Sequence, residues 1–237
     1  MKSVGFASEE QLVKAIVACT RRARRHDYKV EAEVDAGVGI ADLVLAKRSP
    51  RSTAALRALG SMNPRLAVLL SRTVGDAITT RDALASTIGS SSAAAQRLLS
   101  QLTSAGLATG NASDLRLATI STLPFERLIA VEAKVSEWQR VLVQAYRNLQ
   151  FADESWVVLD HAYIRPAIAQ LDRFKVSGVG LASVDRAQGL FIHLAAQNTG
   201  PMSVGKRWQA QAVLAARAVA RRPSPERPQR LVPTGEM

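Results

Sequence analysis

The stretch of sequence best suited to chemistry is a short apolar strand that ends in a Glu-x-Lys pair. It runs from Ile129 to Lys134 and reads Ile-Ala-Val-Glu-Ala-Lys. Residues two apart on a strand project from the same face, so we expect Glu132 and Lys134 to lie side by side. A second apolar strand, Gly39 to Ala46, carries one acid, Asp42, near its start. An acid in that setting is expected to bind a ligand or to be solvated.

These two strands are expected to be antiparallel neighbours. If Ile40 to Lys47 pairs with Leu128 to Lys134, an acid at the start of the first strand meets one at the end of the second, since each residue advances about 3.4 Å. Asp42 and Glu132 would then converge. The chain between the strands, roughly residues 50 to 125, would leave and return at the opposite end of the pair and form an insertion.

Two carboxylates and an ammonium suit the hydrolysis of a phosphodiester bond. Asp42, Glu132 and the carbonyl of Ala133 offer the oxygen ligands that Mg²⁺ or Mn²⁺ prefers, with water and substrate phosphate completing the shell. Lys134 would orient or deprotonate the attacking water and offset charge that develops on the phosphorus. The sequence therefore predicts a metal-dependent nuclease site.

With these residues the chain resembles the PD-(D/E)xK nuclease superfamily. Asp42 lies on the Asp of that motif, Glu132 on its Asp or Glu, and Lys134 on its Lys, while Ala41 stands where the motif has its Pro. The resemblance implies an α/β fold of the restriction endonuclease type, in which helices flank a mixed sheet. It also implies a DNA substrate and catalytic roles for the three polar residues.

The order of the expected elements fits the same resemblance. A first helix, Ser8 to Arg25, opens with the cap Ser8, and its Glu9 is the candidate for the acid that the family carries there. A strand, Tyr28 to Val34, follows this helix. Apolar residues at helical spacing predict a helix over Ser136 to Phe151, and Gln144 falls where several branches of the family carry a catalytic Gln. We also expect a buried strand over Ser155 to Leu159 and a hairpin of strands over 176–184 and 190–196.

The 50–125 segment has a pattern of its own. Asn63 to Leu70 predicts a helix, Thr80 caps a second one, Gly89 makes a turn, and a third helix ends near Ser104 with Ala94, Leu98, Leu99 and Leu102 as its buried stripe. A hairpin with a turn at 110–113 follows. The segment thus resembles a winged helix-turn-helix domain, which binds DNA or serves dimerisation or protein docking. The residues that this resemblance implies for DNA contact are Ser91, Ser92, Gln96, Arg97, Ser100 and Arg116.

We therefore expect four parts in the chain: a nuclease-like domain in two pieces, the winged helix between them, and an unfolded Pro-rich tail. The nuclease-like domain comprises residues 1–49 and 126–222, the winged helix residues 50–125, and the tail residues 223–237.

Composition favours a nucleic-acid partner. The 31 Lys and Arg residues exceed the 20 Asp and Glu residues, which leaves a formal net charge of +11, and such a charge attracts a polyanion. One cysteine, Cys19, excludes an internal disulfide and agrees with a reducing cytoplasm. His161 and His193 lack partners at metal-binding spacing, so we expect them to be hydrogen-bonded structural residues. We expect neither a membrane span nor a secretion signal, and the lack of a Walker-type phosphate loop argues against an ATPase.

The sequence supports one main hypothesis about function and two alternatives. The main hypothesis is a Mg²⁺-dependent or Mn²⁺-dependent DNA endonuclease with a winged helix for targeting, and cleavage of both strands of a duplex would most simply use a homodimer. The alternatives are a catalytically inactive nuclease scaffold that regulates transcription by binding DNA, and an adaptor whose winged helix contacts protein.

Overall fold

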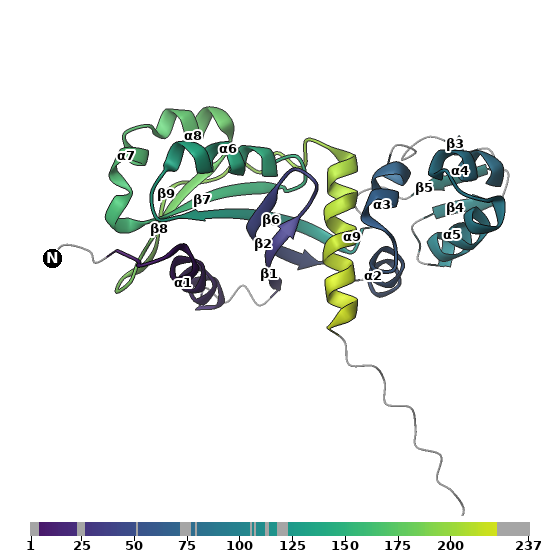
Figure 1. Ribbon diagram of the computed structural model, residues 1–237, viewed down its shortest axis with the longest axis horizontal. Coiled ribbons are helices and arrows are strands. Elements are labelled where there is room, and N and C mark those ends of the chain that lie inside the picture. Colours follow the sequence, from purple (N-terminus) through teal and green to yellow (C-terminus); the bar gives the residue numbers. More distant parts are fainter. Residues whose placement is uncertain are drawn as a thin grey trace, which may run out of the picture.

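The chain folds around a central mixed sheet. The computed structural model describes residues 5–22, 27–50, 52–71, 77–78, 80–104, 106, 108–111, 114–117 and 123–221. Its six-stranded sheet has the order β1-β2-β6-β7-β8-β9 (Figure 1). The β6–β7 and β7–β8 pairs are parallel and the others are antiparallel. The expected α/β class, with a mixed sheet flanked by helices, is confirmed. The strands are β1 (Tyr28–Asp35), β2 (Ile40–Arg48), β6 (Phe125–Lys134), β7 (Glu154–Asp160), β8 (Gly180–Asp185) and β9 (Gly189–Leu194).

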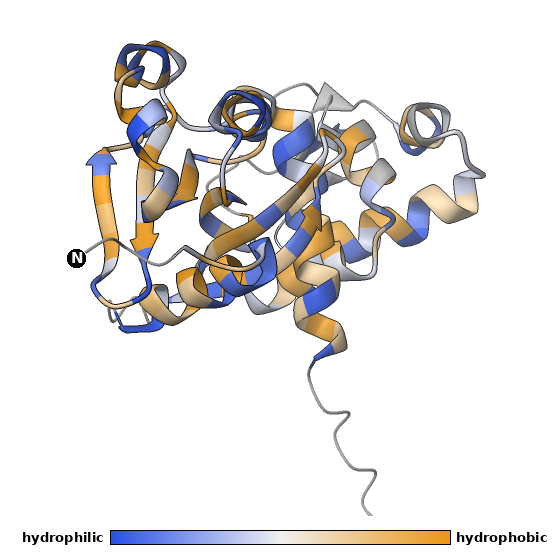
Figure 2. Ribbon diagram, turned by 60° about the vertical axis from the view of Figure 1, so that its left-hand side comes forward, coloured by the Kyte–Doolittle hydropathy of each residue, from blue (hydrophilic) through white to orange (hydrophobic). Residues whose placement is uncertain are grey.

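Continuous apolar runs place β2 and β6 in the interior of this sheet, where each has a neighbouring strand on both sides. Residues 43–46 of β2 and 128–133 of β6 are all buried. Strands covered on both faces read as near-continuous hydrophobic runs, as these two do. In Figure 2 the strands are coloured mainly as hydrophobic, whereas the surrounding helices carry both colours. These two interior strands are therefore well shielded from solvent, and the end of β6 is a rigid place for side chains.

Helices cover both faces of the sheet. Helix α1 (Glu9–Arg22) lies on one face, where Leu12 and Ile16 pack in one core cluster with Leu43 and Val131 (Figure 1). On the other face, α6 (Trp138–Asn148), α7 (Arg165–Ile168) and α8 (Leu171–Ser177) enclose a second cluster that contains Val157. A 3-10 turn, η2 (His161–Tyr163), links β7 to α7. This layering brings the start of α1 and the inner side of α6 to the end of β6.

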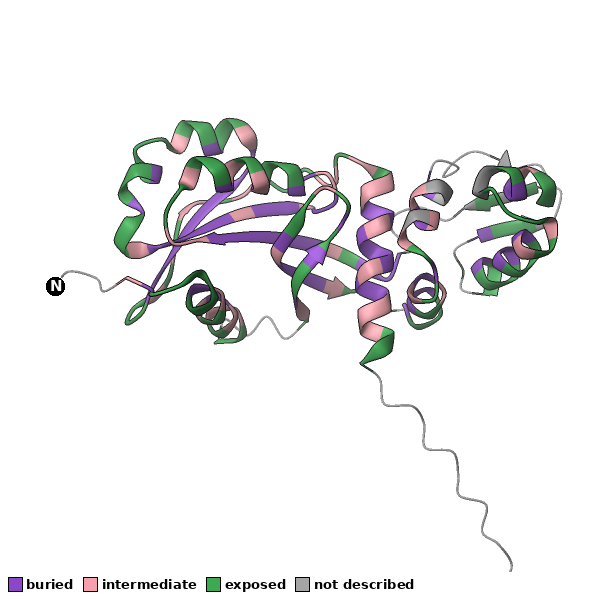
Figure 3. Cartoon of the chain, viewed as in Figure 1, coloured by how far each residue is buried: buried purple, intermediate pink, exposed green. Residues whose placement is uncertain are grey.

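A long helix, α9 (Val204–Ala220), joins the sheet to the 50–125 segment. Trp208 and Leu214 of α9 are buried in a single cluster with Val44 of β2 and Leu56 and Leu84 of the segment. In Figure 3 the buried colour runs from the sheet through α9 into the neighbouring helices. Helices α2 and α3 pack against α9, so the first part of the segment shares a core with the sheet.

The 50–125 segment forms a helical unit with a small sheet. Helices α4 and α5 pack together, and the strands have the order β3-β5-β4. Thr80 caps α4 as expected, with its Oγ1 accepting from Ala83 N at 3.0 Å, and Gly89 ends that helix in the left-handed conformation with φ 61°. The elements are α2 (Thr53–Gly60), α3 (Pro64–Ser71), β3 (Ala77–Ile78), α4 (Arg81–Ile88), α5 (Ser92–Ser104), β4 (Ala108–Asn111) and β5 (Asp114–Leu117).

Several expected boundaries were wrong. Val176 lies in α8 rather than in a strand, because Gly178, with φ 73°, ends this helix and β8 begins only at Gly180. Helix α6 starts at Trp138, after Glu137 adopts a left-handed φ of 56°.

In α5 the buried alanine is Ala95 instead of Ala94. Helix α2 was not expected at all. The expected continuation of the first helix over residues 23–25 lies outside the described residues, as do parts of the hairpin with its turn at 110–113 and the whole tail expected from Pro223. Across the part of the chain that the structure describes, no helix has both the length and the apolar character to cross a membrane.

Candidate active site

Asp42 and Glu132 meet at one end of the β2–β6 pair. These strands are antiparallel with Leu43 opposite Val131, which confirms the expected pairing and places Asp42 opposite Glu132. The Asp42 Oδ2 atom accepts a hydrogen bond of 2.8 Å from the N–H of Ala133. Asp42 therefore binds the backbone between the Glu and the Lys of the motif, and the two carboxylates come from residues ninety positions apart in the chain.

Lys134 completes the group through an ion pair with Glu9 of α1. The Lys134 Nζ and Glu9 Oε2 atoms are in direct contact, with the Lys side chain 24% and the Glu side chain 50% exposed. Glu10 points elsewhere and pairs with Lys14 on the surface of α1. The structure therefore places Glu9, rather than Glu10, beside Lys134, and the expected role of Glu9 in the site stays a prediction.

Burial and proximity perturb the acidity of both carboxyl groups. Loss of solvent raises the pKa of Glu132 to about 7, the neighbouring Asp42 charge adds to this rise, and hydrogen bonding from Asn148 opposes it. Burial also raises the pKa of Asp42, while the Ala133 N–H and the Lys134 charge oppose the rise. The interaction between the two carboxyl groups also acts to raise the pKa of Glu132 and to lower that of Asp42. Such displaced values are typical of carboxylates that hold a cation or transfer protons.

Asn148 is a site residue that the sequence did not reveal. It lies near the end of α6, is 2% exposed, and donates from Nδ2 to Glu132 Oε1 at 2.6 Å. Its position four residues after Gln144 was an available signal, because residues four apart lie on the same side of a helix. Arg140 stands four residues before Gln144 and continues this row.

A cavity of about 210 Å³ opens beside Lys134. Gln144, expected as a catalytic residue, contributes to its wall, and the buried Gln144 Oε1 atom has no hydrogen-bond partner within the described chain. A buried unpaired acceptor costs free energy and marks a place where a ligand or water would bind. The lining residues are Glu9, Lys134, Val135, Ser136, Glu137, Arg140 and Gln144.

The donor set fits a hard divalent cation without forming a complete cage. Within the described residues, His, Cys, Asp and Glu side chains nowhere gather in threes or more in an arrangement that could hold a metal. Mg²⁺ is usually held by one or two carboxylates together with water and substrate phosphate, and Asp42 and Glu132 supply these two carboxylates. Gln144 Oε1 is an unpaired oxygen on the wall of the cavity that Lys134 also lines. At Ala133 the N–H donates to Asp42, and the expected role of the Ala133 carbonyl as a metal ligand stays a prediction.

The residues expected to contact DNA lie on α5 and β5. Ser91 precedes α5 and caps it, with Oγ accepting from Ala94 N at 3.3 Å, while the Ser92 hydroxyl donates to Asp82 Oδ1 of α4 at 2.8 Å. Gln96, Arg97 and Ser100 are exposed along α5. Arg116 of β5 is exposed and pairs with Asp114 at 3.8 Å. Apart from Ser91 and Ser92, whose hydroxyls serve the ends of helices, these side chains are accessible to a partner.

His161 and His193 are hydrogen-bonded, as expected. Both rings contact the buried Ser183 hydroxyl, His161 through Nδ1 at 2.8 Å and His193 through Nε2 at 2.7 Å. Burial lowers the pKa of His193, and the neighbouring His161 lowers it further. Each ring is therefore anchored to the sheet through β8.

Comparisons of this chain with family models, with curated proteins and with solved structures found no match.

Proposed function

We propose that the chain is a metal-dependent DNA endonuclease of the PD-(D/E)xK type. The observation that carries the proposal is the meeting of Asp42, Glu132 and Lys134, with Glu9, at the end of β6. Contacts between α1, β2 and β6 create this group from three segments that are distant in sequence. The rise in the pKa of Glu132 to about 7 supports a site built for a cation or a proton.

In this function Asp42 and Glu132 hold Mg²⁺ or Mn²⁺, with Gln144 Oε1 as a further oxygen donor directly or through water. The bound ion would polarise a phosphoryl oxygen and lower the pKa of its water. Two adjacent carboxylates, one buried and one partly buried, repel each other when both are ionised, and a cation relieves this repulsion. The perturbed acidity of the pair is therefore consistent with a cation site.

Lys134 acts on the substrate side of the group. Its ammonium contacts Glu9 and lines the cavity, so it is held in place to orient the attacking water and to offset negative charge on the phosphate. Asn148 is a positioning residue: its hydrogen bond fixes Glu132 and favours the ionised carboxylate. Arg140, exposed at the cavity wall, is suited to a phosphate oxygen.

The finer fold assignments belong to the same proposal. The order of α1, β1, β2, β6, α6 and β7 supports a restriction endonuclease-like core. The α4–Gly89–α5 arrangement and the β4–β5 hairpin support a winged helix-turn-helix domain in the 50–125 segment. Its exposed α5 residues and the net charge of +11 support DNA as the partner. A homodimer would place two such sites on opposite strands of a duplex. The proposed location of the protein is the cytoplasm.

A second candidate is an inactive scaffold that binds DNA and regulates transcription or acts as an adaptor. Two observations favour it: Lys134 already pairs with Glu9, and within the described residues no three His, Cys, Asp or Glu side chains are arranged so that they could hold a metal. Surviving folds often lose their chemistry. In this case the group at the end of β6 would stabilise the fold only.

Plasmid cleavage distinguishes the two candidates. Supercoiled, single-stranded and branched DNA are incubated with the purified protein in the presence of Mg²⁺, Mn²⁺ or a chelator. The Asp42→Asn and Lys134→Ala variants are tested in parallel. Matched controls are Asp172→Asn and Lys175→Ala, which change exposed residues of α8. Metal-dependent nicking that drops by about a hundredfold or more in both site variants, and stays unchanged in both controls, supports the nuclease. Salt-sensitive binding without cleavage by any form contradicts it and supports the regulator.

A further inference from the structure

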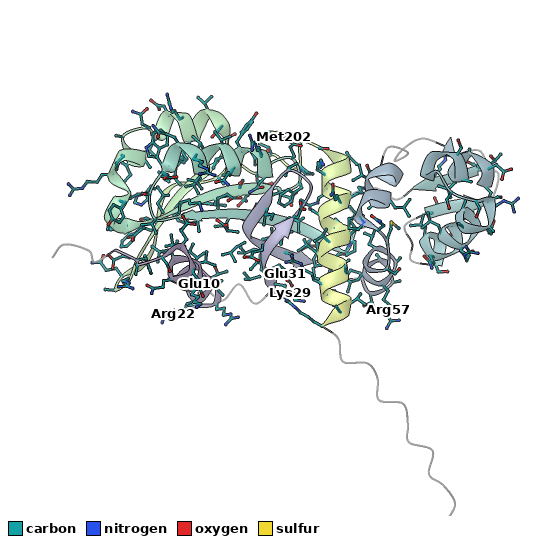
Figure 4. All side chains as sticks on the ribbon, in the orientation of Figure 1. Glu10, Arg22, Lys29, Glu31, Arg57 and Met202 are labelled. Carbon is teal, nitrogen blue, oxygen red and sulfur yellow. The ribbon has the colours of Figure 1, made fainter. Side chains whose placement is uncertain are left out.

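A second cavity lies at the opposite end of β2 from Asp42. It has a volume of about 460 Å³ and is formed where β1, β2 and the start of β6 meet α2 and α9. Figure 4 shows Lys29 and Glu31 of β1 beside the lower part of α9. Asp42 and Arg48 are six residues apart on one strand, so the two sites are separated by about 20 Å. The lining residues are Asp27, Tyr28, Lys29, Ala46, Arg48, Leu56, Phe125, Ala218 and Arg221.

Positive charge exceeds negative charge around this cavity. Lys29 and Arg221 both contact the same oxygen of Glu31, at 3.4 and 2.8 Å, so one buried carboxylate forms ion pairs with two cations. Arg48 donates to two hydroxyls, Ser52 Oγ at 2.8 Å and Thr53 Oγ1 at 3.1 Å. Three cations therefore face two acids, Glu31 and Asp27, and one positive charge is left over.

The guanidinium of Arg48 is the main unneutralised group. Within the described chain it donates to hydroxyl groups and contacts no carboxylate. These two bonds hold the side chain in a defined orientation while its charge stays uncompensated. A fixed guanidinium is well suited to bind a phosphate group, since its planar fork matches the phosphate oxygens.

The other walls of the cavity are apolar and aromatic. Leu56, Phe125, Ala46 and Ala218 line it together with Tyr28. Ligand pockets of 300 to 1,000 Å³ combine such walls with a few polar groups that fix orientation, and an aromatic ring can stack on a nucleobase. The chemistry thus matches a ligand with an anionic end and a flat apolar end.

We propose that this cavity binds a nucleotide phosphate, supplied either by a free nucleotide or by a nucleic-acid strand. Arg48 contacts the phosphate oxygens, Lys29 and Arg221 add positive charge, and the nucleoside lies against the apolar wall. The site is distinct from the group at the end of β6, and it does not depend on whether that group cleaves DNA. In the opposing explanation the three cations only neutralise Glu31 and Asp27.

Binding by the full-length protein tests the proposal, with chelator present so that no cleavage occurs. Deoxyadenosine monophosphate, inorganic phosphate and deoxyadenosine are measured by calorimetry, and a single-stranded oligonucleotide by fluorescence anisotropy. Arg48→Gln removes the free cation, and Arg165→Gln changes an exposed Arg on α7 as its control. Ala218→Glu adds a negative charge at the wall, and Ala218→Gln is its neutral control of similar size. Thermal unfolding checks that every variant folds.

We expect Arg48→Gln to weaken monophosphate binding about tenfold, as for loss of one charge-assisted contact. Ala218→Glu weakens it more than Ala218→Gln, and deoxyadenosine binds to no form. A loss that includes the mononucleotide identifies a free nucleotide as ligand. A loss confined to the oligonucleotide, with the salt slope reduced by about one, identifies a strand. If the parent binds no phosphate ligand, or if folded Arg48→Gln and Ala218→Glu bind like their controls, the proposal is wrong. Cleavage is scored separately, so either proposal can fail alone.

Discussion

Asn148 of α6 donates a 2.6 Å hydrogen bond to the Glu132 carboxylate of β6, and both side chains are 2% exposed. This contact connects a helix on one face of the sheet to the candidate active site. Asn148 favours the ionised form of Glu132, whereas burial favours the protonated form. The balance between the two sets the protonation of Glu132 near neutral pH.

Replacing Asn148 should raise the pKa of Glu132. In Asn148→Leu the carboxylate loses its donor, so its pKa moves above about 7. We expect the acidic limb of the pH–cleavage profile to move to higher pH, and the free energy of unfolding to fall by about 1 to 3 kcal/mol. Carbon-13 NMR titration of labelled Glu and urea unfolding measure the two effects. Asn198→Leu, at an exposed position, is the control, and an unmoved Glu132 titration would contradict the assigned role.

Stability should decrease with pH through the Glu132 window. The folded pKa of about 7 exceeds the ordinary value of 4.5, so the folded state binds more protons than the unfolded state between these values. Stability from this group is therefore fully present below 4.5 and lost as pH rises to 7, which amounts to about 3 kcal/mol. Glu132→Gln should flatten this part of the pH dependence in urea unfolding.

Divalent cation offers a second check on the same group. Mg²⁺ favours ionised carboxylates, so it should stabilise the parent most at the high end of this pH window. It should have little effect on Glu132→Gln. Equal stabilisation of both forms by Mg²⁺ would place the bound cation elsewhere.

The Glu9–Lys134 ion pair should matter more to cleavage than to stability. Both side chains are partly exposed, and pairs of this kind contribute about 0 to 1 kcal/mol. We expect Glu9→Gln to reduce cleavage about tenfold, because Lys134 is no longer held, and Lys134→Ala to reduce it further. Glu10→Gln, which removes the neighbouring surface pair with Lys14, should leave cleavage unchanged. Single-turnover rates compare the variants, and equal loss in Glu9→Gln and Glu10→Gln would refute the specific role of Glu9.

The exposed side of α5 should contribute to DNA affinity. Changing Gln96→Ala together with Arg97→Ala removes two accessible polar side chains, and we expect about tenfold weaker binding in chelator, from lost base or phosphate contacts. Gln101→Ala, on the side of α5 that faces α2, should bind like the parent. Anisotropy titrations at several salt concentrations measure the change. Unchanged affinity in the double variant would favour the adaptor, in which the segment contacts protein.

Local patterns in the sequence determined the strands and caps that build the site. The alternation of side chains along β6 places Glu132 and Lys134 together whatever surrounds them, and the apolar runs of β2 and β6 require burial on both faces. Their antiparallel pairing and the meeting of Asp42 with Glu132 followed from strand geometry. The Thr80 cap and the Gly89 helix end depend on bonds and φ values within a few residues, so they too could be predicted.

Only the tertiary structure decided which helices reach the site and how the 50–125 segment packs against the rest of the fold. The spacing of four residues between Gln144 and Asn148 indicates only a shared side of the helix, whereas the contact of Asn148 with Glu132 depends on how α6 packs across the sheet. The packing of α2 and α3 on α9, and the basic cavity beside them, likewise join residues far apart in the chain. A side chain's type and its place in a helix or strand are local properties. Its partner across the fold depends on the packing of whole elements, which short sequence patterns do not encode.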